Sequence, residues 1–195
     1  AGDLDLRKAI ARKLQRQNNL NVEFENVMVT NGAKQAIYNL FQILLNDGDE
    51  VIIPAPYWLS YPQIVRLAGG KPVFIKSSAE DGFKINMQDL KSKISSKTKF
   101  IIINTPNNPT GRVMSKEELL QIAEVARENK NINILSDEIY ELILKKEFKH
   151  YSLASLATDL KERIFIINGF AKGWAMTGWR VGYLVGSKDV IKASS

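Results

Sequence analysis

The sequence contains no cysteine among its 195 residues and only one histidine, His150. Without cysteine the chain can form no disulfide bridge, no thiolate metal site and no thiol nucleophile. A single histidine also argues against the usual zinc sites and against a Ser-His-Asp hydrolase. We therefore expect no metal site, and we expect His150 to lie on the surface.

Long apolar runs are also missing. None approaches the roughly 18 residues that a membrane-spanning helix needs. The first residues, Ala1-Gly2-Asp3, lack the basic and apolar regions of a secretion signal. These features favour a cytoplasmic protein with no membrane partner. The chain has no initiating methionine and opens directly on a helical pattern, which we interpret as part of a longer protein.

Acidic residues are outnumbered, since 27 lysines and arginines face 21 aspartates and glutamates, for a net charge of +6. Such an excess can indicate a nucleic acid, an anionic membrane or an anionic small molecule. The segment 91–99 holds four lysines but no aromatic residue on which a base could stack. We therefore predict a solvated surface and no nucleic-acid partner.

What is present is the composition of a globular protein, with 45% hydrophobic and 25% charged residues. Short β-branched apolar runs alternate with amphipathic helical patterns, which predicts an α/β fold whose mostly parallel sheet is covered on both faces. Strands are expected at 27–30, 51–53, 73–75, 100–103, 132–135, 164–167 and 181–185. A first helix is expected where Leu6, Ile10 and Leu14 recur at helical spacing, with Asp3 or Asp5 as the N-cap. Further helices are expected at 33–45, 61–67, 87–94 and 115–129, the last with a Ser115–Glu118 capping box.

Ligands of parallel sheets bind beyond the carboxyl ends of the strands, so the residues after each apolar run bear on function. Gly32 opens a helix after the first strand, where free N–H groups favour a phosphate, although a simple turn is equally compatible. Trp58 follows the second strand in a proline-fixed loop. It can stack on a flat ring or pack in the core.

Two further strands end in polar groups. The loop 104–111 carries consecutive amides, among them Asn108, and Pro109 is a candidate for a cis bond; an ordinary turn is the alternative. Asp137 follows another apolar run, where burial is costly unless the carboxylate is paired. A cationic ring nitrogen would be one partner, and a role as helix N-cap is the other reading. Tyr140, three positions later, can reach the same side of the turn.

The segment after the sixth strand places Lys172 among small and apolar residues. A lysine desolvated in this way makes a good Schiff-base nucleophile. Arg180 lies eight positions further on, where its guanidinium could bind a phosphate.

Together these motifs resemble the fold-type I pyridoxal-phosphate enzymes, and more closely the prokaryotic-type aspartate aminotransferase branch of the class I aminotransferases. The resemblance spans the chain and is carried by four segments in the family's order: 56–58, 107–111, 137–140 and 172–182. It implies a mixed, seven-stranded sheet sandwiched by helices. It also implies pyridoxal 5′-phosphate as cofactor and transfer of an amino group from an amino acid, aspartate, to a 2-oxo acid, 2-oxoglutarate.

The resemblance further assigns roles at the cofactor ring. Lys172 would form the Schiff base and shuttle a proton. Asp137 would pair with the ring nitrogen and keep it protonated. Tyr140 and Asn108 would bind the ring's 3′ oxygen, and Trp58 would stack on its face. Trp58 and Asn108 would also contact the substrate.

At the phosphate, the resemblance implies backbone donors from Gly32, Ala33 and Lys34, with Arg180 as the charged partner. The sequence departs from many relatives at Gly169, where a serine three residues before the lysine commonly binds the phosphate. Phosphate binding would therefore depend more on Arg180, the helix N-terminus and any neighbouring subunit.

The family's members are about twice as long, so residues 1–195 would be the cofactor-binding large domain without the N-terminal arm and the C-terminal small domain. A homodimer is the expected assembly of the longer protein, and weak or no turnover is expected of this piece. Three alternatives stay open: an aminotransferase of aromatic, prephenate or alanine specificity, a β-lyase, and a non-catalytic aminotransferase-like sensor domain. A cofactor-free structural fragment is a further reading.

Overall fold

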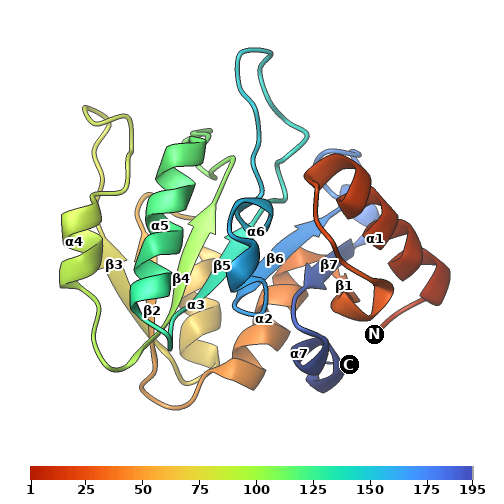
Figure 1. Ribbon diagram of the computed structural model, residues 1–195, viewed down its shortest axis with the longest axis horizontal. Helices are drawn as coiled ribbons and strands as arrows, with labels where there is room; N and C mark the ends of the chain where they lie inside the picture. Colours follow the sequence, from red (N-terminus) through yellow and green to blue (C-terminus); the bar gives the residue numbers. More distant parts are fainter. Residues whose placement is uncertain (195) are drawn as a thin grey trace.

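A single seven-stranded sheet forms the centre of the protein in the computed structural model, which describes residues 1–194 (Figure 1). The strands lie in the order β1-β7-β6-β5-β4-β2-β3. Strand β7 is antiparallel to both neighbours, while the other pairings are parallel, so the predicted mixed, mostly parallel sheet is confirmed. The strands are β1 (Val27–Asn31), β2 (Glu50–Pro54), β3 (Lys71–Ile75), β4 (Thr98–Asn104), β5 (Asn133–Asp137), β6 (Ile164–Gly169) and β7 (Val181–Val185).

Helices cover both faces of the sheet, as Figure 1 shows. One face is covered by α2 (Gly32–Leu44), α3 (Ser60–Leu67) and α7 (Lys188–Ala193). The other is covered by α1 (Leu4–Asn18), α4 (Met87–Ser92), α5 (Lys116–Glu128) and α6 (Leu153–Leu156). Three short 3₁₀ turns complete the elements: η1 (Phe24–Asn26), η2 (Thr158–Leu160) and η3 (Thr177–Trp179).

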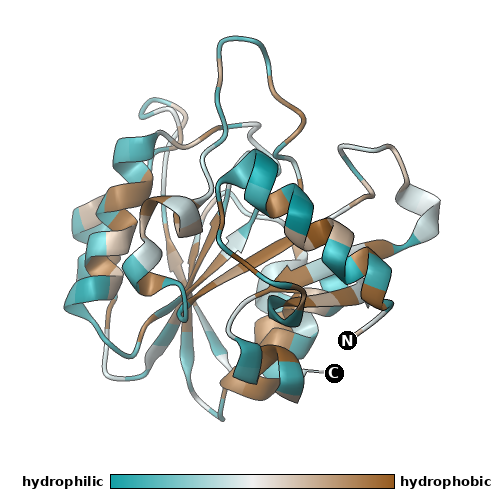
Figure 2. Cartoon of the chain, turned by 45° about the vertical axis from the view of Figure 1, so that its right-hand side comes forward, coloured by the Kyte–Doolittle hydropathy of each residue, from teal (hydrophilic) through white to brown (hydrophobic). Residues whose placement is uncertain are grey.

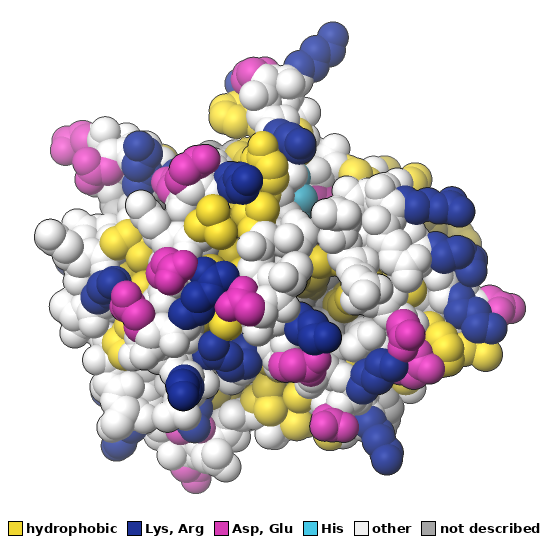
Figure 3. Space-filling view, viewed as in Figure 1, with side chains coloured by type: hydrophobic (Ala, Val, Ile, Leu, Met, Phe, Trp, Pro, Cys, Tyr) yellow, Lys and Arg dark blue, Asp and Glu magenta, His cyan; other side chains and the backbone are white. Residues whose placement is uncertain are grey.

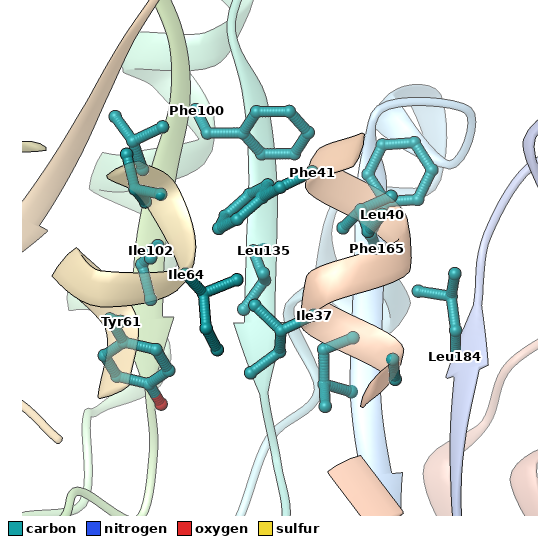
Figure 4. Packing of buried hydrophobic residues seen from close by; sticks show 14 of the residues in the cluster. Ile37, Leu40, Phe41, Tyr61, Ile64, Phe100, Ile102, Leu135, Phe165 and Leu184 are labelled. Atoms are coloured by element: carbon teal, nitrogen blue, oxygen red, sulfur yellow. The ribbon is translucent and has the colours of Figure 1, made fainter. Parts of the chain in front are cut away.

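The core follows from the alternation of side chains along each strand. In β4, Phe100 and Ile102 pack toward α2 and α3, whereas Ile101 and Ile103 pack toward α5. Figure 4 shows the first of these layers, where Phe41 of α2 meets Phe100 edge-on with ring centroids 5.2 Å apart. Because both faces of the central strands are covered, these strands are apolar throughout, as their brown colour in Figure 2 shows.

The helix ends follow local sequence rules. Asp3 is the N-cap of α1 and accepts a hydrogen bond of 2.9 Å from the Leu6 amide, which decides between the two predicted caps. Ser115 and Glu118 form the predicted capping box at the start of α5. The predicted helix at 87–94 ends earlier, at Ser92. Elements as short as α6 and the 3₁₀ turns were not predicted, because a few residues show no measurable period.

The surface is strongly charged. Lysines and arginines are interspersed with aspartates and glutamates on the face in Figure 3, as the sequence predicts for a solvated surface. Within residues 1–194, no helix has both the length and the apolar character needed to cross a membrane.

Two features of the fold bring distant segments to one edge of the sheet. The parallel strands β1, β2, β4, β5 and β6 all end there, so the loops that follow them meet. Because β7 runs in the opposite direction, its first residues lie at the same edge. Arg180, immediately before β7, therefore lies at the same edge as the carboxyl ends of the other strands.

Candidate active site

The predicted site residues meet around one cavity of about 280 Å³ at this edge. All of them except Gly32 line it, and Gly32 is the neighbour of Ala33 at the start of α2. The structure adds residues that the sequence analysis did not single out, above all Tyr61 and Asn104. The lining consists of Ala33, Lys34, Trp58, Tyr61, Asn104, Asn108, Asp137, Ile139, Tyr140, Ala171, Lys172 and Arg180.

Asp137 is the last residue of β5 and only 4% exposed. Its Oδ2 accepts a hydrogen bond of 2.6 Å from the Tyr61 hydroxyl, and its Oδ1 accepts one of 3.2 Å from the Ile139 amide. The pKa of Asp137 is raised to about 6: burial is the main cause, the charge of Glu138 adds to it, and the two hydrogen bonds oppose it. Asp137 ends a strand and caps no helix, so the alternative reading as an N-cap is wrong.

Tyr61 comes from the first turn of α3 and is 1% exposed. Its ring packs edge-on against Trp58, with centroids 5.3 Å apart. Burial, together with the charge and the hydrogen bond of Asp137, raises the pKa of Tyr61 well above its ordinary value. In the sequence, Tyr61 looks like any core aromatic of an amphipathic helix, so no local signal marks it as a partner of Asp137.

Asn104 holds two neighbouring loops together. Its side-chain amide donates to the Asp137 carbonyl oxygen over 3.0 Å, and its Oδ1 accepts from the Asn108 amide over 2.7 Å. Asn104 ends β4 beside the end of β5. Its side chain therefore fixes the backbone at Asp137 and at Asn108, the two residues predicted to contact the ring nitrogen and the 3′ oxygen. The sequence placed Asn104 in the right loop but gave it no role.

Asn108 and Tyr140 lie side by side, with 3.5 Å between the Asn108 side-chain nitrogen and the Tyr140 hydroxyl. Burial raises the pKa of Tyr140, the charge of Asp137 raises it further, and the hydrogen bond from Asn108 opposes both. The peptide bond before Pro109 is cis, as predicted. Asn107 folds the loop by accepting hydrogen bonds from both the amide and the hydroxyl of Thr110.

Lys172 lies on the loop after β6, and its ammonium nitrogen is 5.8 Å from the centre of the Tyr140 ring. The expectation that Lys172 is desolvated is wrong for the structure described here, because its side chain is exposed. The adjacent Gly173 and Trp174 are exposed as well, so the small and apolar residues around the lysine form a rim and do not cover it.

The cavity also has an end suited to an anion. Helix α2 begins at Gly32 without a side-chain cap, and the N–H groups of a first helical turn have no acceptor within the helix. The Arg180 guanidinium covers this turn: a Cβ atom on Gly32 would lie 2.4 Å from Arg180 Nη2. Arg180 reaches this place with a left-handed backbone, at φ 55°. A side chain at 32 would push the guanidinium aside, and the backbone of Gly32 itself favours glycine because its φ is +73°.

The presence of glycine at position 169, where many relatives are expected to carry a serine, has a steric cause. A Cβ atom there would lie 2.8 Å from the Val181 carbonyl oxygen and 2.9 Å from the Gly182 Cα atom. Strand β7 passes too close to β6 for any side chain at this position. The hydroxyl that many relatives are expected to carry here is therefore excluded by the packing of this chain.

A buried polar network lies next to Asp137, centred on Glu138 and His150. Glu138 is fully buried and accepts hydrogen bonds from Ser136 and Ser152, at 2.9 and 2.8 Å. His150 Nε2 lies 3.2 Å from Glu138 Oε2, so the predicted surface position of His150 is wrong. Burial lowers the pKa of His150, but the hydrogen bond and the charge of Glu138 outweigh this and raise it overall.

Glu141 extends this network toward α1. It forms an ion pair with Lys13 and accepts hydrogen bonds from Asn18 and Asn168. Ligand atoms of Glu138, Glu141 and His150 lie within 4.8 Å of one another. Both carboxylates already hold several donors, however, so this cluster balances buried charge within the protein and we assign it no metal.

The arrangement of the cavity fits one kind of ligand. Asp137 provides a buried carboxylate whose two donors are both neutral groups, which suits a positively charged ring nitrogen. Trp58 provides an aromatic wall, and α2 with Arg180 provides an anion site at the other end. A phosphorylated heteroaromatic ring with a basic nitrogen matches all three features, and Lys172 lies where its amine could reach such a ring.

Comparison with protein families gives one match, to "Aminotransferase class I and II", over residues 1–194. Among curated proteins, the chain is 52% identical to a probable aspartate/prephenate aminotransferase of Rickettsia felis over 188 residues, 96% of this chain and 46% of that protein. It is 50% identical to the aspartate aminotransferase of Bacillus subtilis over 192 residues, 98% of this chain and 49% of that protein. The chain thus spans about half the length of these relatives.

Solved structures agree in fold. Thermus thermophilus aspartate aminotransferase with maleate has a TM-score of 0.94 and 46% identity, covering all of this chain and 50% of that one. An aromatic aminotransferase from Pyrococcus horikoshii has a TM-score of 0.95 and 42% identity, covering 99% of this chain and 52% of that one.

Proposed function

Because the chain belongs to the class I and II aminotransferase family, we propose that it is the part of a transaminase that binds pyridoxal 5′-phosphate. The proposed reaction moves an amino group between an amino acid and a 2-oxo acid. The observation that carries this proposal is the buried Asp137 carboxylate, which lies in one cavity with Lys172 and with the anion site of α2.

The bound cofactor supplies an aldehyde carbon and an electron-accepting ring. In the proposal, Lys172 is the residue that would hold that carbon through its amine, and the same amine would move a proton to and from the substrate's Cα atom. Asp137 would keep the ring nitrogen protonated by offering it a negative charge. Tyr140 and Asn108 would donate hydrogen bonds to the ring's 3′ oxygen, and Trp58 would stack on the ring face.

We propose that the phosphate binds the first-turn amides of α2, at Gly32, Ala33 and Lys34, with Arg180 neutralising its charge. The position of the guanidinium over Gly32 supports this role.

Aspartate and 2-oxoglutarate are the proposed substrates. The names of the Rickettsia and Bacillus relatives support aspartate. The prephenate in the Rickettsia name and the aromatic aminotransferase from Pyrococcus keep those specificities open. Profiling amino acids and 2-oxo acids with the longer protein would decide among them. The β-lyase and sensor-domain readings have no specific observation in their favour.

We further propose that residues 1–195 form the cofactor-binding large domain, and that the longer protein is a homodimer located in the cytoplasm. The coverage of about half of each relative supports the domain assignment. Sedimentation of the longer protein would test the dimer.

The decisive experiment is to add pyridoxal phosphate to the chain, record the absorbance spectrum, reduce with borohydride and map the labelled peptide. We expect a new absorbance band and a label on Lys172. The variant Lys172→Ala should give neither. A label on another lysine, or none on the folded chain, would contradict the proposed site.

A further inference from the structure

Tyr61 touches both the buried carboxylate and the aromatic wall of the cavity. Its hydroxyl donates to Asp137 Oδ2 over 2.6 Å, and its ring lies edge-on to Trp58. We propose that Tyr61 is a positioning residue: its hydroxyl fixes the Asp137 carboxylate in its charged form, so that the cavity selects a ligand with a protonated ring nitrogen. This inference rests on the proposed function, because it concerns how the same site recognises its ring.

The orientation of the Asp137 carboxylate is set by two donors on two different oxygens. Tyr61 binds Oδ2 and the Ile139 amide binds Oδ1. Rotation of the carboxylate would break both hydrogen bonds at once. At 2.6 Å, the Tyr61 bond has the length of a hydroxyl bound to a charged oxygen, which is among the stronger protein hydrogen bonds.

The surroundings of Tyr61 favour the position that it occupies. Its ring is buried in the core layer between α2, α3 and the sheet (Figure 4). Its side chain is 1% exposed, and a buried hydroxyl without a partner would be costly, so the hydrogen bond to Asp137 holds it in this position. The donor is therefore in place before any ligand arrives.

Apart from the Tyr61 hydroxyl, the Ile139 amide is the group that stabilises the charge of Asp137, whereas the neighbouring Glu138 carboxylate opposes that charge. Loss of the Tyr61 hydroxyl would leave the Ile139 amide as the remaining donor to the carboxylate. Such a loss should weaken the binding of a ring whose nitrogen carries a proton, and it should matter little to a ring without that nitrogen.

The test compares two ligands on the same chain. The affinities of pyridoxal phosphate and of its 1-deaza analogue, in which C–H replaces the ring nitrogen, are measured for the wild-type chain and for Tyr61→Phe. We expect Tyr61→Phe to weaken pyridoxal phosphate by about tenfold or more, with little change for the analogue. Tyr57→Phe is the matched control, because Tyr57 stacks on Phe74 and does not line the cavity. It should change neither affinity.

Equal losses for the two ligands would show that Tyr61 only shapes the cavity and would overturn the inference. A second measurement needs no cofactor: the Asp137 carboxyl is titrated by carbon-13 NMR, with Asp137→Asn to assign its signal. Tyr61→Phe should raise the pKa of Asp137, and an unchanged titration would also overturn the inference. If the wild-type chain fails to bind pyridoxal phosphate, the proposed function fails, and the titration still decides the role of Tyr61.

Discussion

Asp137 places a carboxylate where water is largely excluded, and the folded chain tolerates this because Tyr61 and Ile139 donate hydrogen bonds to it. These two neutral donors do not offset burial fully, since the pKa of Asp137 rises from 3.8 to about 6. The charged carboxylate is thus destabilised by burial, and a positively charged ligand would stabilise it. A raised carboxyl pKa of this kind is typical of a binding site, where the ligand provides the opposite charge that the protein lacks.

The first prediction concerns the stability of the cofactor-free chain. Because the pKa of Asp137 is raised on folding, its contribution to stability is complete below pH 3.8 and is lost as the pH rises through about 6. Asp137→Asn removes this loss, so it should be more stable than wild type at pH 8 by up to about 3 kcal/mol. The difference should shrink toward zero near pH 4. Urea unfolding at the two pH values measures it.

Asp5→Asn serves as the control for this prediction, because Asp5 is an exposed residue in the first turn of α1. It should show no comparable gain at pH 8. A variant Asp137→Asn that is less stable than wild type at pH 8, but not near pH 4, would mean that the charged carboxylate stabilises the folded chain.

At the scale of elements, the site depends on the closeness of β7 and α2. Gly182 lies opposite Gly169 and Thr30 in the sheet, between β6 and β1. A Cβ atom on Gly182 would lie 2.3 Å from the Ala33 amide nitrogen and 2.4 Å from the Gly32 carbonyl carbon. The first turn of α2 therefore rests directly on the backbone of β7, which places its amides beside Arg180.

The second prediction follows from this contact. Gly182→Ala should push α2 away from β7, destabilising the chain by about 1–3 kcal/mol, the usual range for overpacking. It should also weaken the binding of pyridoxal phosphate, because the first-turn amides move. Urea unfolding and a binding titration measure the two effects.

Gly178→Ala is the matched control, since a Cβ atom at Gly178 would meet nothing within 4 Å. We expect nearly wild-type stability and affinity for this variant. Similar behaviour of the two alanine variants would show that the approach of β7 to α2 is not needed for the site.

At the scale of the whole molecule, the cavity collects residues from both ends of the chain, from Ala33 to Arg180. They meet only when β1, β5, β6 and β7 occupy one sheet. An unfolded chain presents them far apart and should have no affinity for the cofactor. Binding and folding are therefore linked by mass action.

The third prediction is that pyridoxal phosphate stabilises the chain against unfolding. A concentration 100 times the dissociation constant should add about 2.7 kcal/mol to the free energy of unfolding. Pyridoxal at the same concentration should add less, because it lacks the group that meets α2 and Arg180. Thermal or urea unfolding with each ligand measures this, and equal stabilisation by the two would argue against the anion site.

The order and type of the main elements could be read from the sequence, because apolar periodicity and capping are local properties. The run 100–103 lies within β4, which extends beyond it at both ends, and the run 132–135 corresponds to β5, which begins one residue later and ends at Asp137. Ser115 caps α5 as predicted. The short helices α6 and α7 were not predicted, because so few residues show too little apolar periodicity to indicate a helix.

The sequence also determined which loops carry the chemistry, because strand ends and their motifs can be recognised without coordinates. Only the tertiary structure decided which groups touch. It joined Tyr61 to Asp137 across 76 positions, buried the lone histidine against Glu138, and left Lys172 exposed on the rim. Contact and burial depend on how distant segments pack, and no pattern of neighbouring residues contains that information.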